Sequence, residues 1–173
     1  MIFTGPPASG KSALAEQVAE EVPWPLFTKD EFKESLADIF EVDSLEWSHR
    51  LGSASFVLLF EIAGKLLASG VTVMIEGNFE GARTEADLTE LAEMAELLQI
   101  NCVAPHDVLV ERYTDRSTER HPIHVSAKRI EDPVVLETLQ PLPPLAIPGE
   151  VLEIDTTLPL DANVASVLAW LRR

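Results

Sequence analysis

The feature that most constrains this chain lies close to its start, where Gly5-Pro6-Pro7-Ala8-Ser9-Gly10-Lys11-Ser12 matches the phosphate-loop pattern G-x-x-x-x-G-K-[ST]. The apolar run Ile2-Phe3-Thr4 before it is typical of a strand, and residues 13–22 after it have helical spacing. In that frame, backbone N–H groups and the positive end of the helix dipole converge on phosphate oxygens. We therefore predict that this loop, with Ala13, binds nucleotide phosphates, that Lys11 reaches the outer phosphates as a catalytic cation, and that Ser12 ligates Mg²⁺.

Composition limits the partners and the compartment. The 173 residues are 46% apolar, which suits one domain spanning residues 1–173 with a sizeable core. The formal net charge of −16 makes nucleic acid and anionic membranes poor partners. Cys102 stands alone, which excludes a disulfide framework and a cysteine metal cluster, and the longest unbroken apolar run, Phe56–Phe60, is too short to cross a bilayer. Because the phosphate loop begins at Gly5, no signal peptide is expected, and we predict a cytoplasmic protein.

Strand-like and helical segments alternate along the chain, which favours an α/β fold with a parallel sheet. Strands are predicted at 2–4, 25–28, 71–75, 101–104 and 151–154, and helices at 13–22, 30–40, 44–69, 84–98, 106–120 and 161–172, the last capped by Asp161. The run Val71–Ile75 is apolar and β-branched, as in a central strand covered on both faces. We therefore expect a three-layer sandwich in which helices cover both faces of a parallel five-stranded sheet. The proline-rich run 141–148 indicates a loop that either closes over a nucleotide base or simply connects two elements.

A second polar stretch, Thr28-Lys29-Asp30-Glu31-Phe32-Lys33, follows the second predicted strand. Ligands of open α/β sheets bind at this carboxyl edge, beside the phosphate loop. Asp30 is therefore a candidate catalytic base that takes the proton of an attacking hydroxyl, and Lys33 is a candidate for binding an anionic part of the acceptor. The structural alternative is that Thr28 or Asp30 caps the helix, since Thr28-x-x-Glu31 fits a capping box.

A third stretch, Glu76-Gly77-Asn78, follows the most apolar strand. Glu76 is a candidate either for the water shell of Mg²⁺ or for orienting the acceptor together with Asn78. The alternative is an ordinary polar turn. Either Asp30 or Glu76 is then the carboxylate that activates the acceptor.

A fourth set, Arg112, Arg116 and Arg120, is spaced four residues apart and would share one face of a helix. Between Arg112 and Arg129 there are five cations, including Lys128, and two carboxylates, Asp115 and Glu119, although the whole chain is acidic. We predict that the three arginines clamp the triphosphate and that Arg116 stabilises charge during transfer. The alternative is a solvated helix face paired with the two carboxylates. His121 and His124 nearby are interpreted as part of a polar segment rather than as a metal site.

Taken together, these stretches resemble the P-loop kinases of the AAA_33 type, whose relatives include the kinase domains of polynucleotide 5′-kinases and, more distantly, gluconate kinases and chloramphenicol phosphotransferases. The resemblance implies that Asp30 is the acceptor-activating base, that Arg112 lies near adenine and Arg116 on the phosphates, and that a small mobile lid spans roughly residues 116–126. It also implies that 143–157 is similar to the base-covering loop and final strand. Two departures stand out, because Lys33 replaces a frequent Arg and Glu76 replaces the more usual Asp.

The sequence therefore predicts a Mg²⁺-assisted kinase that moves the γ-phosphoryl group of ATP to a hydroxyl of a small-molecule acceptor. No Asn-Lys-x-Asp guanine-binding motif is present, which favours ATP. The alternatives are a polynucleotide 5′-hydroxyl kinase, which the negative charge opposes, and a non-catalytic ATP-binding sensor or simple NTPase.

Overall fold

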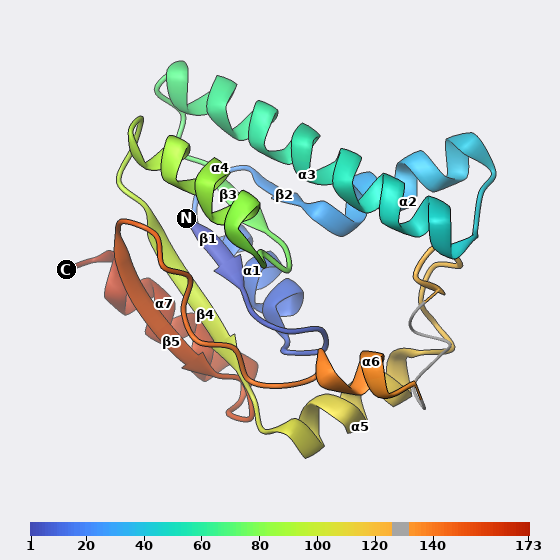
Figure 1. The fold of residues 1–173 in the computed structure, drawn as a ribbon. Helices are drawn as coiled ribbons and strands as arrows, with labels where there is room; N and C mark the ends of the chain where they lie inside the picture. The colour runs from blue at the N-terminus through green and yellow to red at the C-terminus, as the bar shows by residue number, and fades with distance from the viewer. Residues whose placement is uncertain (126–131) are drawn as a thin grey trace.

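Five parallel strands form one sheet in the computed structural model of the chain, which describes residues 1–125 and 132–173. They run in the order β2-β3-β1-β4-β5 (Figure 1). Their bounds are β1 (Ile2–Thr4), β2 (Leu26–Thr28), β3 (Met74–Glu76), β4 (Leu98–Val103) and β5 (Glu150–Asp155). The parallel direction brings the carboxyl ends of all five strands to one edge, where the phosphate loop leaves β1.

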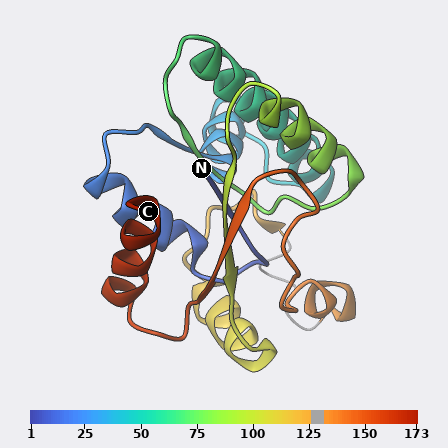
Figure 2. The same ribbon diagram turned by 90° about the vertical axis from the view of Figure 1, so that its left-hand side faces the viewer.

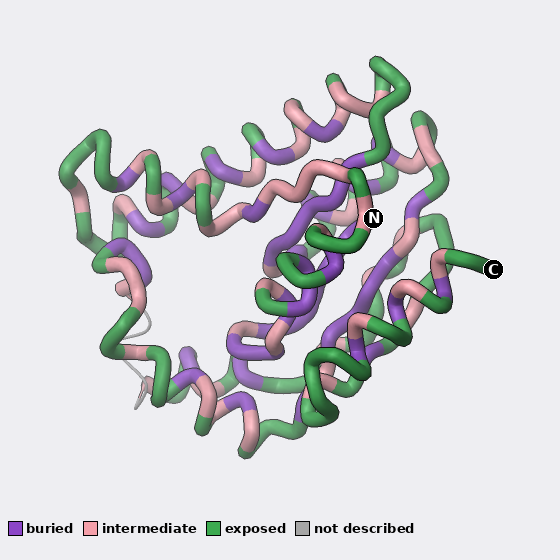
Figure 3. The backbone as a smooth tube through the Cα atoms, turned by 180° about the vertical axis from the view of Figure 1, so that it is seen from behind, coloured by how far each residue is buried: buried purple, intermediate pink, exposed green. Residues whose placement is uncertain are grey.

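Helices cover both faces of this sheet, as the sequence predicts (Figure 2). On one face, α1 (Lys11–Glu21) and α7 (Leu160–Leu171) pack through Val18 and Trp170 against Phe3. On the other face, α3 (Leu45–Ala68) and α4 (Ala82–Ala92) pack on the sheet through a second apolar cluster. The central strands are buried between these layers (Figure 3). The predicted three-layer α/β fold is therefore confirmed.

The remaining helices lie toward the carboxyl edge of the sheet and surround the phosphate loop. They are α2 (Lys29–Phe40), which packs along α3, α5 (His106–Arg116) and the short α6 (Pro133–Glu137). A small apolar cluster joins α5 and α6 to the loop through Leu109, Val135 and Ala8. This cluster fixes one wall of the site described below.

Helix α3 is the one described helix whose length and composition alone would let it cross a membrane. Core helices of globular proteins meet the same criterion. Here Leu51, Leu59 and Ala63 of α3 are buried in the protein.

Several element boundaries differ from the sequence predictions, and three of these differences bear on the sheet or the site. The helix predicted over 84–98 ends at Ala92, because residues 98–103 pair with β5 and residues 99–101 also pair with β1, and this pairing overrides the amphipathic pattern. The helix predicted over 106–120 ends at Arg116, so Arg120 does not share a helix face with Arg112. Residues 71–73 precede the β3 ladder, which begins at Met74.

The cap of α7 differs from its prediction, and one short helix was not predicted. Pro159 rather than Asp161 is the N-cap of α7, and the Asp161 carboxylate accepts from the adjacent Ala162 N–H at 2.9 Å. Helix α6, whose five residues begin with Pro133 after an Asp132 cap, was not predicted, because so short a helix leaves no periodic pattern.

Candidate active site

The phosphate loop between β1 and α1 adopts a backbone that few residues other than glycine tolerate. Gly5 and Gly10 have φ values of 143° and 79°, and a Cβ on Gly5 would collide with the carbonyl oxygen of Cys102. Ala8 is also left-handed at φ 62°, and Ser9 N donates to the Pro6 carbonyl at 3.2 Å to close the turn. The loop therefore curls over the start of α1, where free N–H groups of a helix are available to an anion.

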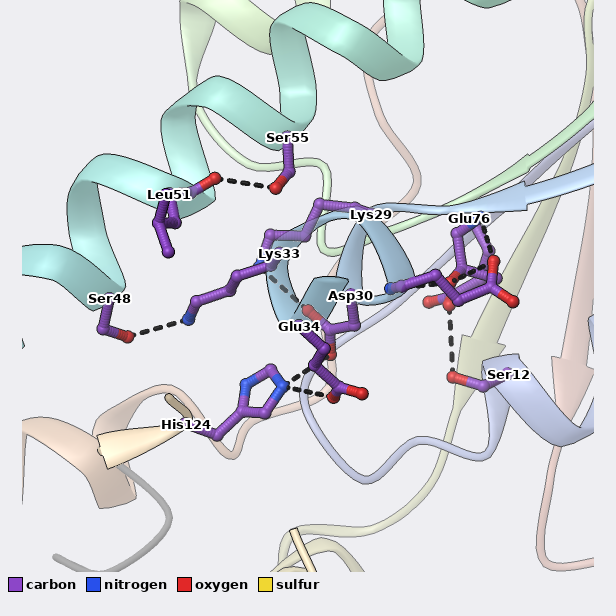
Figure 4. Close-up of polar contacts among 12 residues, drawn as sticks. Ser12, Lys29, Asp30, Lys33, Glu34, Ser48, Leu51, Ser55, Glu76 and His124 are labelled. Carbon is purple, nitrogen blue, oxygen red and sulfur yellow. Dashed lines mark hydrogen bonds and ion pairs between the residues drawn. The ribbon is translucent and has the colours of Figure 1, made fainter. Parts of the chain in front are cut away.

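Lys11 and Ser12 at the start of α1 both meet Glu76, the last residue of β3. Lys11 Nζ lies 3.7 Å from Glu76 Oε1, and Ser12 Oγ donates to Glu76 Oε2 at 3.2 Å (Figure 4). Burial raises the pKa of Glu76 above its ordinary value, although Lys11 and the Ser12 hydrogen bond oppose that rise. A hydroxyl and a carboxylate are oxygen donors of the kind that Mg²⁺ takes together with water and phosphate, so these residues fit that ion.

Thr28, at the end of β2, caps α2 and so settles one alternative left by the sequence. Its hydroxyl accepts from Glu31 N at 3.2 Å, while Glu31 Oε2 accepts from Thr28 N at 3.2 Å, which completes a capping box. Because Thr28 supplies the cap, the carboxylate of Asp30 is not used for it. That carboxylate instead lies among cations.

Asp30 contacts Lys29 on one oxygen and Arg120 on the other. Lys29 Nζ donates to Asp30 Oδ1 at 3.0 Å, and Arg120 Nη2 donates to Oδ2 at 2.8 Å. Burial alone would raise the pKa of Asp30, but the charges of Lys29 and Arg120, together with His124 in its protonated form, outweigh it and hold that pKa well below its usual range. The carboxylate is therefore ionised at neutral pH and has two cations within hydrogen-bond distance.

Lys33, one turn further along α2, is buried, and no carboxylate of the described residues lies within ion-pair distance of it. Its Nζ donates to the neutral Ser48 hydroxyl of α3 at 2.8 Å (Figure 4), and it forms no ion pair with any described residue. Burial, helped by Lys29, lowers the pKa of Lys33 to about 8. A buried ammonium without a counter-ion is costly, and an anionic ligand would remove that cost.

A cavity of about 380 Å³ brings most of these groups together, although Glu76 does not line it. Its walls include Lys11 and Ser12 of the phosphate loop, Asp30 and Lys33 of α2, and Asn78 after β3. The cavity also includes Lys29 and Tyr113, for which the sequence predicts no role, and His124, which was interpreted as part of a polar segment. We call it the acceptor cavity, after the role that is proposed for it below. Its volume lies within the range of small-molecule sites.

A second cavity of about 550 Å³, the nucleotide cavity, lies on the other side of the phosphate loop. Arg112 forms one wall and is fixed by two hydrogen bonds to Thr156, from Nη1 to Oγ1 at 3.0 Å and from Nη2 to the carbonyl at 2.7 Å. Leu158 and Leu160 add apolar surface of the kind on which a base packs. Residues 141–148 line neither cavity, and Leu145 and Ile147 pack on the apolar cluster under α4, which favours the plain-connection alternative.

Arg116 lines both cavities, and its guanidinium pairs with no side chain among residues 1–125 and 132–173. Arg120 instead contacts Asp30, because the chain leaves the helix after Arg116. Of the lid predicted at 116–126, residue 126 lies outside the described residues, as do Lys128 and Arg129. The described part is not simply polar, since Ile123 is fully buried and His124 is 8% exposed.

Comparison with known proteins finds solved structures that share this fold. A chain from Chloroflexus aurantiacus J-10-fl, provisionally described as a kinase, is 35% identical, with a TM-score of 0.87, over 99% of this chain and 95% of its own. A sugar kinase from Janibacter sp. HTCC2649 is 20% identical (TM-score 0.66; coverage 99% and 92%), and a gluconokinase from Sinorhizobium meliloti 1021 is 21% identical (TM-score 0.60; coverage 99% and 90%). No curated protein matches.

The parallel sheet and its phosphate loop define the α/β fold of the P-loop kinases. More particularly, the AAA_33 family model, described as an AAA domain, matches residues 1–134, and the chain belongs to that family of P-loop kinases.

Proposed function

We propose that this protein transfers the γ-phosphoryl group of ATP to a hydroxyl of a small-molecule acceptor. One observation carries the proposal: the phosphate loop and the ionised Asp30 carboxylate line the same cavity. A hydroxyl bound there would meet both a proton acceptor and the end of a polyphosphate. Phosphoryl transfer asks for little beyond such positioning and neutralisation of charge.

In this proposal Asp30 accepts the proton of the acceptor hydroxyl as its oxygen bonds to the γ-phosphorus. The bond from that phosphorus to the β–γ bridging oxygen breaks, and ADP leaves with the electron pair. Lys11 and Arg116, which pairs with no side chain in the described part of the chain, neutralise charge on the transferring group. Because the pKa of Asp30 lies below its usual range, the proton moves late, as the loose transition state of phosphoryl transfer allows.

Ser12 and Glu76 would hold Mg²⁺, with Glu76 acting through water. When bound, the ion neutralises the phosphate oxygens. The base of ATP would pack in the nucleotide cavity beside Arg112 and Leu158.

The acceptor would carry an anionic group as well as the reacting hydroxyl. The buried Lys33 supports this, because its hydrogen-bond partner among the described residues is the neutral Ser48 hydroxyl. Asn78 would bind a second hydroxyl. The gluconokinase among the structural neighbours makes hydroxy acids the first compounds to try.

The test is a screen of hydroxy acids and a metabolite extract for products phosphorylated by ATP and magnesium. The Lys11→Ala variant serves as the blank. A product formed by the wild-type protein alone supports the proposal. ATP binding without any product would favour a sensor, and steady phosphate release without acceptor would favour an NTPase. Labelling of a 5′-hydroxyl oligonucleotide would favour a polynucleotide kinase. Each of these results would overturn the proposal.

A further inference from the structure

The segment that follows α5 returns to α2 and makes ionic contacts along one side of it. Asp30, Glu34 and Asp38 are spaced four residues apart on α2 and so share one face. Arg120 contacts Asp30, His124 contacts Glu34 at 2.7 Å, and His121 contacts Asp38 at 2.9 Å. Ile123 lies between these contacts and packs on Ala37 of α2 and Leu51 of α3. The segment is therefore attached by an apolar side chain and three polar ones.

His124 connects Glu34 to Arg120, and its two partners fix where its proton lies. Its Nε2 lies 2.7 Å from Glu34 Oε1, and its Nδ1 lies 3.3 Å from Arg120 Nη2. A carboxylate only accepts and a guanidinium only donates. Both contacts are satisfied only when Nε2 carries the proton and Nδ1 is bare, so the imidazole is neutral.

We propose that Glu34 and His124 are positioning residues that hold Arg120 against the carboxylate of Asp30, and that protonation of His124 releases Arg120. Glu34 orients the imidazole, the imidazole accepts from Arg120, and Arg120 donates to Asp30 from the same nitrogen. This inference deepens the proposed function, on which its catalytic consequence rests. The contacts themselves do not depend on that function.

Protonation at Nδ1 would set an N–H against the Arg120 guanidinium and remove its acceptor. The charged groups that face His124 are Asp30, Lys33 and Glu34 from α2 and Arg120 from its own segment. Burial lowers the pKa of His124 below its ordinary value and exceeds the opposing effect of Glu34 and Asp30. His124 is therefore neutral at pH 7, and Arg120 is released only at lower pH.

The experiment is histidine ¹⁵N and carboxyl ¹³C NMR on the full chain without substrate, titrated from pH 8 to pH 5. We expect His124 to show a proton on Nε2 at pH 7.5, and the Asp30 ¹³C signal to shift in step with the protonation of His124. In Glu34→Gln, loss of the neighbouring negative charge should move the His124 transition and the Asp30 transition together to lower pH, by about 1 pH unit. In His124→Gln, which keeps a donor near Glu34 but has no Nδ1, the Asp30 transition should disappear.

His121→Gln is the matched control, because His121 lies on the same segment and faces Asp38 instead. It should leave the Asp30 transition in place. A proton on Nδ1 at pH 7.5, or an Asp30 signal that ignores His124 in the wild type, would overturn the inference, whether or not any acceptor is found.

Kinetics with an acceptor from the screen give a second readout. The acceptor KM should rise below the His124 transition, while the KM for ATP stays constant. Glu34→Gln should move that rise to lower pH, as in the NMR titration. A KM profile unchanged by both the Glu34→Gln and the His124→Gln substitutions would refute the positioning role. Absence of any phosphorylated product would refute the proposed function and leave the NMR result to judge the contacts.

Discussion

Replacing Asp30 by Asn separates a catalytic carboxylate from one that only pairs with its neighbours. The amide keeps the shape and an acceptor oxygen, but it cannot take a proton from the acceptor hydroxyl. General-base catalysis contributes about 10² to 10⁴ in rate, so we expect kcat to fall about 10³-fold, equivalent to about 4 kcal/mol of activation free energy. The KM for ATP should stay within about twofold, because the nucleotide cavity does not include Asp30.

The effect on stability should be much smaller. The Asp30 side chain is 39% exposed, so its pairs with Lys29 and Arg120 are partly screened by water. Exposed ion pairs contribute about 0 to 1 kcal/mol, and we expect the free energy of unfolding to fall by no more than about 1 kcal/mol. Denaturant unfolding measures this quantity, and a coupled assay for ADP with ³¹P detection of the product measures kcat.

Thr28→Ala is the matched control in the same turn. It removes the capping box and should cost about 1 kcal/mol of stability while leaving kcat nearly unchanged. If Asp30→Asn retained full turnover with the true acceptor, or if both variants lost only stability, the reasoning that makes Asp30 a base would be refuted.

Three further predictions concern other parts of the site. The acceptor KM should rise above pH 8, because Lys33 has a pKa of about 8 and loses its charge as the pH increases through that value. In Lys33→Arg the acceptor KM should stay constant over the same alkaline range, and equal pH profiles for the two proteins would contradict this prediction. Arg116→Ala should lower kcat by about 10³-fold with little change in ATP affinity by calorimetry, and Arg116→Lys should recover part of it, whereas a change confined to affinity would argue against charge stabilisation in transfer. Gly5→Ala should lower the free energy of unfolding by more than about 1 kcal/mol in denaturant titrations, because of its positive φ and the Cys102 carbonyl; an unchanged midpoint would show that the loop relaxes.

The phosphate loop and the alternation of elements were predictable because they depend on local signals. Gly5 and Gly10 have backbone conformations that few other residues adopt. The apolar run ending in Ile75 is typical of a strand covered on both faces. The boundary after Ala92 was not predictable, because the chain leaves the helix to form β4, which pairs with β5 from Leu98 and with β1 from Gln99. Such pairing depends on residues distant in sequence.

The acceptor side of the site shows the same limit. The sequence placed Asp30 and Lys33 together by spacing, but it gave no indication that Arg120 would reach Asp30 across 90 residues of chain. It also interpreted His124 as part of a polar segment. One available signal was the row of carboxylates Asp30, Glu34 and Asp38 on one face of α2, because such a row needs hydrogen-bond donors from elsewhere in the chain. His124 contacts Glu34, and His121 contacts Asp38.

The two cavities meet at a common wall made by Ala8, Ser12 and Arg116. These three residues line both the proposed nucleobase site and the proposed hydroxyl site. A single compound that joins adenosine to the acceptor through a chain of phosphates would therefore bridge both compartments at once. Such a tethered inhibitor would gain affinity from both halves without paying twice for lost translational freedom.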